Sequence, residues 1–154
     1  MSDKLVRPVI EPYQVTSPYG ERIINGKKEF HTGIDYVNQN DDRRLVSIAN
    51  GIVFADKDNY NHAKRYLDPE HSVGNFIILQ HIINGKDYFS YYFHVEENYV
   101  SKDDVVEQGQ IIGKYGDVGY GWGAHLHFEI RNAYFQRFNF VPLMIDGLKA
   151  NGLL

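Results

Sequence analysis

Short runs rich in valine, isoleucine, tyrosine and phenylalanine recur along this chain every ten to fifteen residues. Glycine, asparagine or aspartate residues separate the runs, and this spacing is typical of an all-β sandwich or barrel. Nine segments have this character and are the expected strands: 13–16, 29–31, 34–37, 45–47, 52–55, 75–81, 88–94, 111–114 and 125–131. The sequence therefore predicts an all-β fold in which helix is a minor component.

The clearest connection between two runs is the dipeptide Asn84-Gly85. Both residue types tolerate the positive φ angles of a type I′ turn, which is the turn that best matches the twist of paired strands. We therefore expect 76–83 and 86–94 to form a β-hairpin, with His94 at the end of its second strand.

Three polar or glycine-rich stretches are expected to be loops: 56–72, 96–109 and 116–123. In the last of them, glycines alternate with Tyr120 and Trp122. These aromatic residues are consistent either with the wall of a substrate groove or with a flexible connection that buries one tryptophan. Pro142 is placed as a first helical residue, so a short C-terminal helix with a structural role is expected over 141–149.

Composition excludes several classes of protein. The 154 residues, 43% apolar and 23% charged, predict one globular domain spanning 1–154. A net charge of −4 argues against nucleic-acid binding. No apolar run is long enough to cross a bilayer, and residues 1–9 lack the apolar stretch of a secretory signal, so we expect a soluble chain without an export signal. Because cysteine is absent, any metal must be held by nitrogen and oxygen ligands.

Two short histidine strings suggest a metal site. One is the string from His31 to Asp35 and the other is His125-Leu126-His127, with His94 between them in the sequence. Together they supply two imidazoles and a carboxylate for a metal, and two more imidazoles for proton transfer. This set suits metal-assisted hydrolysis, which needs three protein ligands, an open position for water and an adjacent base.

Strand alternation places His125, His127 and Glu129 on one face of the last predicted strand. Residues on the same face lie roughly 6.6 Å apart at Cα, so one imidazole can bind a metal while the other points at the metal's ligand. A histidine pair on a solvated strand face has the same pattern. Glu129 is expected either to orient a ligating histidine or to form a surface salt bridge.

His31 and Asp35 would lie roughly 13 Å apart on a straight strand, too far to share one ion. The chain must therefore bend between them, and Gly33 is where a bulge or kink costs least. His94 ends an aromatic run, where a hydrogen-bonded structural histidine is the alternative. For His81, which has no partner at a suggestive spacing, a structural role is expected.

The order of these elements resembles the LytM/lysostaphin-type zinc metallopeptidases of peptidase family M23, which cut peptidoglycan cross-links. The resemblance covers roughly 15–132, leaving 133–154 as a C-terminal extension. Its motifs run in order along the chain: SPYGER at 17–22, HTGID at 31–35, ANGIV at 49–53, the strand ending at His81, YFH at 92–94, VEQGQIIG at 106–113, the glycine loop and HLHFEI at 125–130. Several ordered motifs are far more specific than any one of them.

The resemblance implies a single Zn²⁺ held by His31, Asp35 and His127, with His94 and His125 as the catalytic imidazoles. It also implies an antiparallel β-sheet with an open groove over one face. No ligand or catalytic position of the family pattern is missing. Two segments depart from it: 60–72 is longer than the usual tight turn, and the glycine loop lacks the usual small hydroxyl residues and proline.

The function expected from the resemblance is a zinc-dependent endopeptidase that hydrolyses peptide cross-links of bacterial peptidoglycan. Its partners would be stem or bridge peptides, bound by a monomer at the cell wall, outside the cell or in the periplasm. Without an export signal, a phage-encoded protein or a mature form is expected. Substrate contacts are expected from Tyr120 and Trp122, and from Tyr92, for which packing within its strand is the alternative.

Two alternatives to this function remain open at this point. One is a non-catalytic domain of the same family that binds peptidoglycan or activates another hydrolase. The other is a non-haem iron oxygenase on a β-barrel, because two histidines and a carboxylate also describe its metal site.

Overall fold

The computed structural model describes residues 4–57, 75–116 and 123–148. Its elements are β1 (Tyr13–Ser17), β2 (Gly20–Ile24), β3 (Lys27–His31), β4 (Ile34–Asn38), β5 (Arg44–Val46), β6 (Gly51–Lys57), β7 (Phe76–Ile83), β8 (Lys86–Phe93), β9 (Val95–Asn98), β10 (Val105–Val106), β11 (Ile111–Tyr115), β12 (Leu126–Asn132) and α1 (Val141–Leu148). The predicted all-β class with one short C-terminal helix is confirmed.

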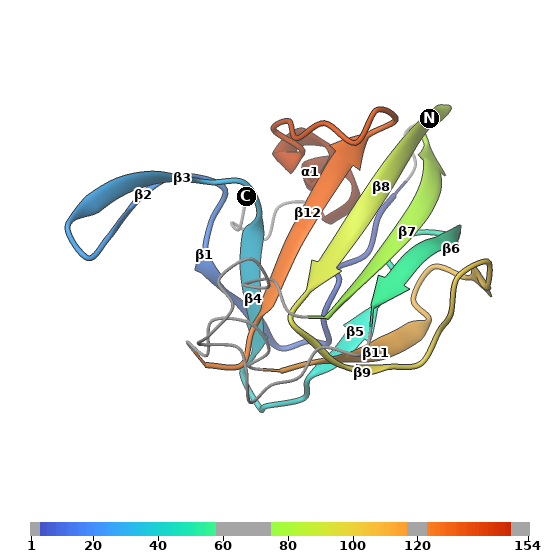
Figure 1. Ribbon diagram of the computed structural model, residues 1–154, viewed down its shortest axis with the longest axis horizontal. Coiled ribbons are helices and arrows are strands. Elements are labelled where there is room, and N and C mark those ends of the chain that lie inside the picture. The colour runs from blue at the N-terminus through green and yellow to red at the C-terminus, as the bar shows by residue number, and fades with distance from the viewer. Residues whose placement is uncertain (1–3, 58–74, 117–122, 149–154) are drawn as a thin grey trace.

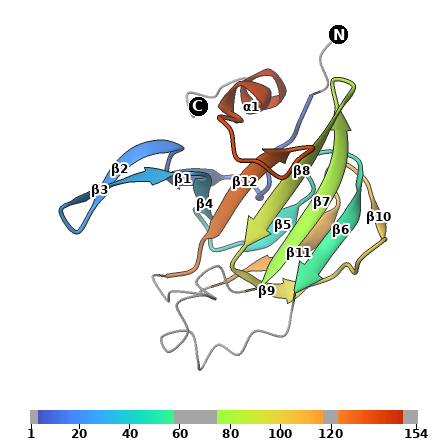
Figure 2. The same cartoon turned by 45° about the horizontal axis from the view of Figure 1, so that its top comes forward.

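In the part of the chain that the structure describes, the strands form three antiparallel sheets. The largest has seven strands in the order β1-β4-β12-β8-β7-β6-β10, and its central strands lie side by side in Figure 1. A second sheet has the order β5-β11-β9. The third is a two-stranded ribbon of β2 and β3 that extends away from the seven-stranded sheet in both Figure 1 and Figure 2. The chain returns from this ribbon into β4 at the point where the candidate ligands lie.

The main core lies between the seven-stranded and three-stranded sheets. Tyr92 and Phe128 from the large sheet and Leu45 and Ile112 from the small sheet belong to one buried cluster. Met144 of α1 also packs into this cluster. The strands β4 and β12 alternate buried core residues with residues that face the opposite side of the sheet, as period-2 patterning requires.

The opposite face of the large sheet carries a smaller apolar cluster of Ile78, Phe89, Tyr91 and Phe93. Cross-strand register aligns this face with β12, because His127 lies opposite Phe93 and Glu129 lies opposite Tyr91. This face therefore carries Asp35 and His127 with a buried apolar cluster beside them.

The predicted hairpin is confirmed, because Asn84 and Gly85 have φ angles of 52° and 78° between the paired strands β7 and β8. The loop expected over 96–109 is partly wrong. It contains most of β9 and all of β10, which pair with β11 and β6. Sequence patterning missed these strands because β9 is charged and β10 has two residues, so both depend on pairing with distant strands.

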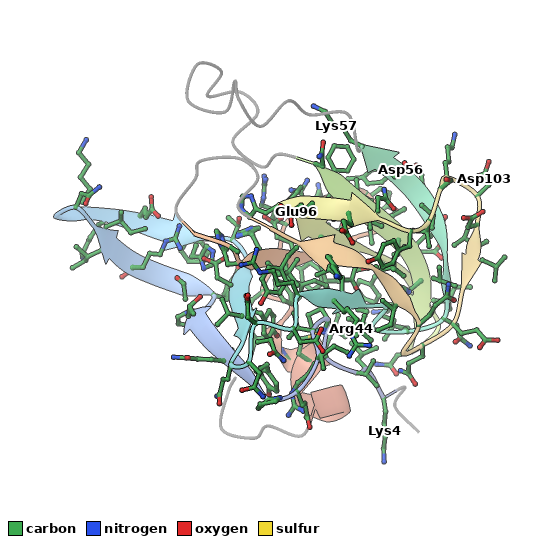
Figure 3. The ribbon with its side chains drawn as sticks, turned by 90° about the horizontal axis from the view of Figure 1, so that it is seen from below. Lys4, Arg44, Asp56, Lys57, Glu96 and Asp103 are labelled. Atoms are coloured by element: carbon green, nitrogen blue, oxygen red, sulfur yellow. The ribbon has the colours of Figure 1, made fainter. Side chains whose placement is uncertain are left out.

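Side-chain contacts tie the end of β6 to the end of β9 and to the segment that follows it. Asp56, labelled in Figure 3, lies near the end of β6. Its carboxylate accepts hydrogen bonds from the Lys102 backbone amide at 2.9 Å and the Asn98 amide group at 3.5 Å.

Among the residues that the structure describes, no helix has the length and apolar character needed to span a membrane.

Candidate metal centre

Three segments that are distant in the sequence bring the candidate ligands together. His31 is the last residue of β3, and Asp35 is the second residue of β4. Between them the chain leaves the two-stranded ribbon and enters the seven-stranded sheet, which is the bend that the sequence required. Asp35 then pairs directly with His127 in the register of β4 and β12.

The three potential donor atoms form a compact triangle. Nε2 of His31 lies 3.2 Å from Oδ1 of Asp35 and 3.1 Å from Nδ1 of His127, and the remaining edge is 2.9 Å. Four ligands at zinc bond lengths of about 2.0–2.1 Å stand roughly 3.3 Å apart around a tetrahedron. The triangle therefore fits one ion of this size, and two imidazoles with a carboxylate are ligands that zinc accepts. Within the described residues, these three form the group whose side chains could hold a metal ion.

The remote ring nitrogens of both histidines have acceptors. Nδ1 of His31 lies 2.9 Å from the carbonyl oxygen of Pro18, and Nε2 of His127 lies 2.8 Å from the Glu129 carboxylate. Because a carbonyl and an ionised carboxylate only accept, each remote nitrogen carries the proton. With a metal bound, the opposite nitrogen of each ring would present its lone pair to the centre of the triangle, as a metal ligand must.

The charges around the site favour an ionised Asp35. Burial alone would raise the pKa of this carboxyl, but hydrogen bonds and charge from His127 and His31 outweigh burial and hold its pKa far below the usual range. The Arg22 guanidinium lies 3.5 Å from Oδ2, the carboxylate oxygen outside the triangle. Arg22 also donates a 3.0 Å hydrogen bond to Ser17.

His127 lies between two carboxylates. Burial lowers its pKa, but hydrogen bonds to Asp35 and Glu129 outweigh burial, so its pKa is raised. Burial would raise the pKa of Glu129, whereas His127 and Arg131 lower it to about 2. Phe93 stacks on the His127 ring at a centroid distance of 5.5 Å and closes one side of the ring.

The two predicted catalytic histidines are neighbours. Their ring centroids lie 4.5 Å apart, and the His94 ring lies 6.4 Å from that of His127. His94 follows β8 directly and has a φ of 65°, a conformation that costs energy for a residue with a side chain. Gly116 connects the two backbones: its amide donates to the His94 carbonyl at 2.8 Å, and its carbonyl accepts from the His125 amide at 3.3 Å.

The structure contradicts the prediction that Tyr92 contacts substrate. Its side chain is fully buried on the core face, where its hydroxyl donates to the Val46 carbonyl at 2.6 Å and accepts from the Ile48 amide at 3.2 Å. The neighbouring Tyr91 and Phe93 face the metal side instead. Side-chain alternation along β8 allowed Tyr92 to face either the core or the metal side, because aromatic residues occupy both faces of this strand. Tyr120 and Trp122 lie outside the described residues.

Sequence reasoning missed several residues that support the ligands. Ser17, Pro18 and Arg22 belong to the SPYGER motif, which was noted only as part of the resemblance. Thr32 donates a 3.0 Å hydrogen bond to Glu129 from the connection between two ligands. Their place within the SPYGER and HTGID motifs was the one sequence signal of a role for these residues. Their hydrogen-bond partners lie on other elements, so local pattern does not identify them.

Comparison with known proteins places the chain in a family of peptidases. A family model described as peptidase family M23 matches residues 29–139, which is more than half of the chain. The chain is 27% identical over 132 residues to the peptidoglycan DD-endopeptidase ShyC of Vibrio cholerae serotype O1, covering 84% of this chain and 27% of ShyC. The chain spans less than a third of the length of the first curated relatives it matches.

Solved structures share the fold. The antimicrobial peptidase lysostaphin from Staphylococcus simulans superposes with a TM-score of 0.68 and 26% identity, covering 91% of this chain and 53% of lysostaphin. A zinc-containing peptidase from Vibrio cholerae has a TM-score of 0.62 and 27% identity, covering 80% of this chain and 35% of that peptidase. By the extent of the family match and by its fold, this chain belongs to peptidase family M23.

Proposed function

We propose that this chain is a zinc-dependent endopeptidase that hydrolyses peptide cross-links of bacterial peptidoglycan. The observation that carries the proposal is the donor triangle of His31, Asp35 and His127 with two further histidines beside it. A triangle of three protein donors leaves a fourth tetrahedral position for water or substrate, which is the arrangement of catalytic rather than structural zinc sites.

Zinc bound by these three residues would act as a Lewis acid on a peptide carbonyl and would lower the pKa of water toward roughly 7. Asp35, His31 and His127 would hold the ion. Oδ2 of Asp35 is in an ion pair with Arg22, and the remote nitrogens of His31 and His127 are hydrogen-bonded to Pro18 and Glu129. This support keeps the ligand side chains in place and reduces their reorganisation during the reaction.

We assign acceptance of the proton to His125. Its Nδ1 lies 2.9 Å from the Gly123 carbonyl oxygen, so Nδ1 carries the proton and Nε2 is the basic nitrogen. His94 lies beside it and would stabilise the developing negative charge or protonate the departing amine. With both imidazoles in place, a hydrolase is favoured over a non-catalytic domain that binds peptidoglycan or activates another hydrolase.

The proposed substrate class is the stem or bridge peptide of peptidoglycan, bound by a monomer at the cell wall, outside the cell or in the periplasm. ShyC is a peptidoglycan DD-endopeptidase, which makes the cross-link between stem peptides the first bond to test. A glycine bridge is the second. Mass spectrometry of products from defined muropeptides containing each bond distinguishes them.

The decisive experiment is digestion of purified peptidoglycan sacculi by the purified chain. We expect release of soluble muropeptides, loss of release after treatment with a chelator, and recovery when Zn²⁺ is added. Binding to sacculi without release would support the non-catalytic alternative. Turnover that requires iron and oxygen would support the oxygenase alternative.

A further inference from the structure

Glu129 is a buried carboxylate beside the donor triangle but not part of it. It lies two residues beyond His127 on the same face of β12, and only 2% of its surface is exposed. A carboxylate in such a position is unfavourable unless hydrogen bonds and opposite charges compensate for lost hydration. The partners of its two oxygens therefore show what this residue does.

One oxygen joins the two segments that carry the ligands. Oε2 lies 2.8 Å from Nε2 of His127 and accepts a 3.0 Å hydrogen bond from the Thr32 hydroxyl. Thr32 lies in the connection between His31 and Asp35. A single oxygen atom thus connects the strand that supplies one ligand with the turn that lies between the other two.

The other oxygen binds two guanidinium groups. Oε1 accepts hydrogen bonds from Nε of Arg131 at 2.9 Å and from Nε of Arg137 at 3.2 Å. Arg137 comes from the turn that follows β12. In this turn the Asn132 side-chain oxygen accepts a 3.0 Å hydrogen bond from the Gln136 backbone amide. Two guanidinium groups occupy Oε1, so Oε2 is the oxygen that accepts hydrogen bonds from the ligand segments.

The effect on His127 is specific. An imidazole can ligate through either nitrogen, and an acceptor on the remote nitrogen selects the tautomer, fixes the ring orientation and increases ligand basicity. A carboxylate does this more strongly than the neutral Pro18 carbonyl that serves His31, because the bond is charge-assisted.

We propose that Glu129 is a positioning residue that assembles the metal centre, orienting His127 and joining the turn that contains Thr32 to β12. This inference rests on the proposed zinc site. It assigns to Glu129 a role in metal affinity and ligand geometry that does not require contact with substrate.

The test measures the zinc dissociation constant of the full chain by competition with a chromophoric chelator. We expect Glu129→Gln to raise the dissociation constant roughly 10- to 100-fold, the usual range for loss of such a partner. Glu97→Gln is the matched control, because Glu97 is an exposed residue on β9 whose carboxylate lies 3.9 Å from Lys114. The control should leave zinc affinity unchanged.

A second measurement separates positioning from a general structural role. Co²⁺ in place of Zn²⁺ should give a shifted visible absorption spectrum in Glu129→Gln, because the geometry at His127 changes. If Glu129→Gln does not fold, Thr32→Val removes one bond to the same oxygen and should weaken zinc binding by a smaller factor. Unchanged zinc affinity and an unchanged Co²⁺ spectrum in the folded variant would overturn the proposal. A wild-type chain that binds no zinc would instead contradict the proposed function.

Discussion

Gly33 packs directly against His127, so closely that a Cβ atom on Gly33 would lie 2.7 Å from Nε2 of the histidine ring. The same atom would lie 2.5 Å from the Phe128 carbonyl oxygen. The sequence suggested Gly33 as the place for a kink. The structure shows a different requirement, which is the close approach of the ligand-bearing turn to β12.

Gly33→Ala should therefore weaken zinc binding and destabilise the fold. The Cβ atom must displace either the His127 ring or the β12 backbone, and overpacking of this kind costs roughly 1–3 kcal/mol. Zinc titration and urea unfolding measure the two effects. Gly113→Ala is the control, because its Cβ would lie 2.3 Å from the Glu97 carbonyl, on the other sheet from the donor triangle. That control should lose stability while the folded protein keeps its zinc affinity.

Substitution of a proposed metal ligand and of a proposed proton-transfer histidine should affect zinc binding and hydrolysis differently. Asp35→Ala removes a proposed ligand, so zinc content and hydrolysis should be lost together. His125→Ala leaves the donor triangle complete, so zinc should remain bound while hydrolysis falls by at least the roughly 100-fold typical of a proton-transfer group. Metal analysis and a sacculus-digestion assay on the same preparations check this. Normal digestion by His125→Ala would show that its assigned role is wrong.

Tyr92→Phe should affect stability and not substrate preference. The substitution leaves the Val46 carbonyl and the Ile48 amide without their buried partner, at a cost of roughly 1–3 kcal/mol. Urea unfolding measures that cost, and digestion of defined muropeptides measures specificity. A change in the bond that is cut, without loss of stability, would restore Tyr92 as a substrate contact.

His81 should make the fold sensitive to mild acid. Burial lowers its pKa from 6.5 to about 4, and its Nε2 lies 2.7 Å from the Ser90 hydroxyl. As pH falls below 6.5, the unfolded chain binds a proton that the folded chain excludes, so stability is lost until pH reaches about 4. The slope should approach ~1.4 kcal/mol per pH unit in this window.

The measurement is the free energy of unfolding between pH 4 and 7 for the wild type and His81→Gln. Other titrating groups contribute equally to both proteins, so the difference in slope reports His81. Parallel curves would show that His81 has the same pKa in the folded and unfolded chains, which would contradict the burial effect.

Much of the architecture follows from local pattern. Alternation placed Phe128 and Ile130 in the core, and Asn84-Gly85 specified its turn, because side-chain direction along a strand and positive φ are local properties. The ribbon strand β2 was missed because it carries Glu21 and Arg22 and lies in an exposed ribbon, so it has no apolar face to detect.

The sequence by itself determined the fold class, the faces of the central strands and the residue types available to a metal. The tertiary structure alone decided that His31 and Asp35 meet across two different sheets, that Tyr92 faces the core, and that Glu129 is buried under two arginines. Periodicity distinguishes two faces of a strand but not what covers each one. That depends on which distant strands pair and in which register, and these contacts are not encoded in any single segment.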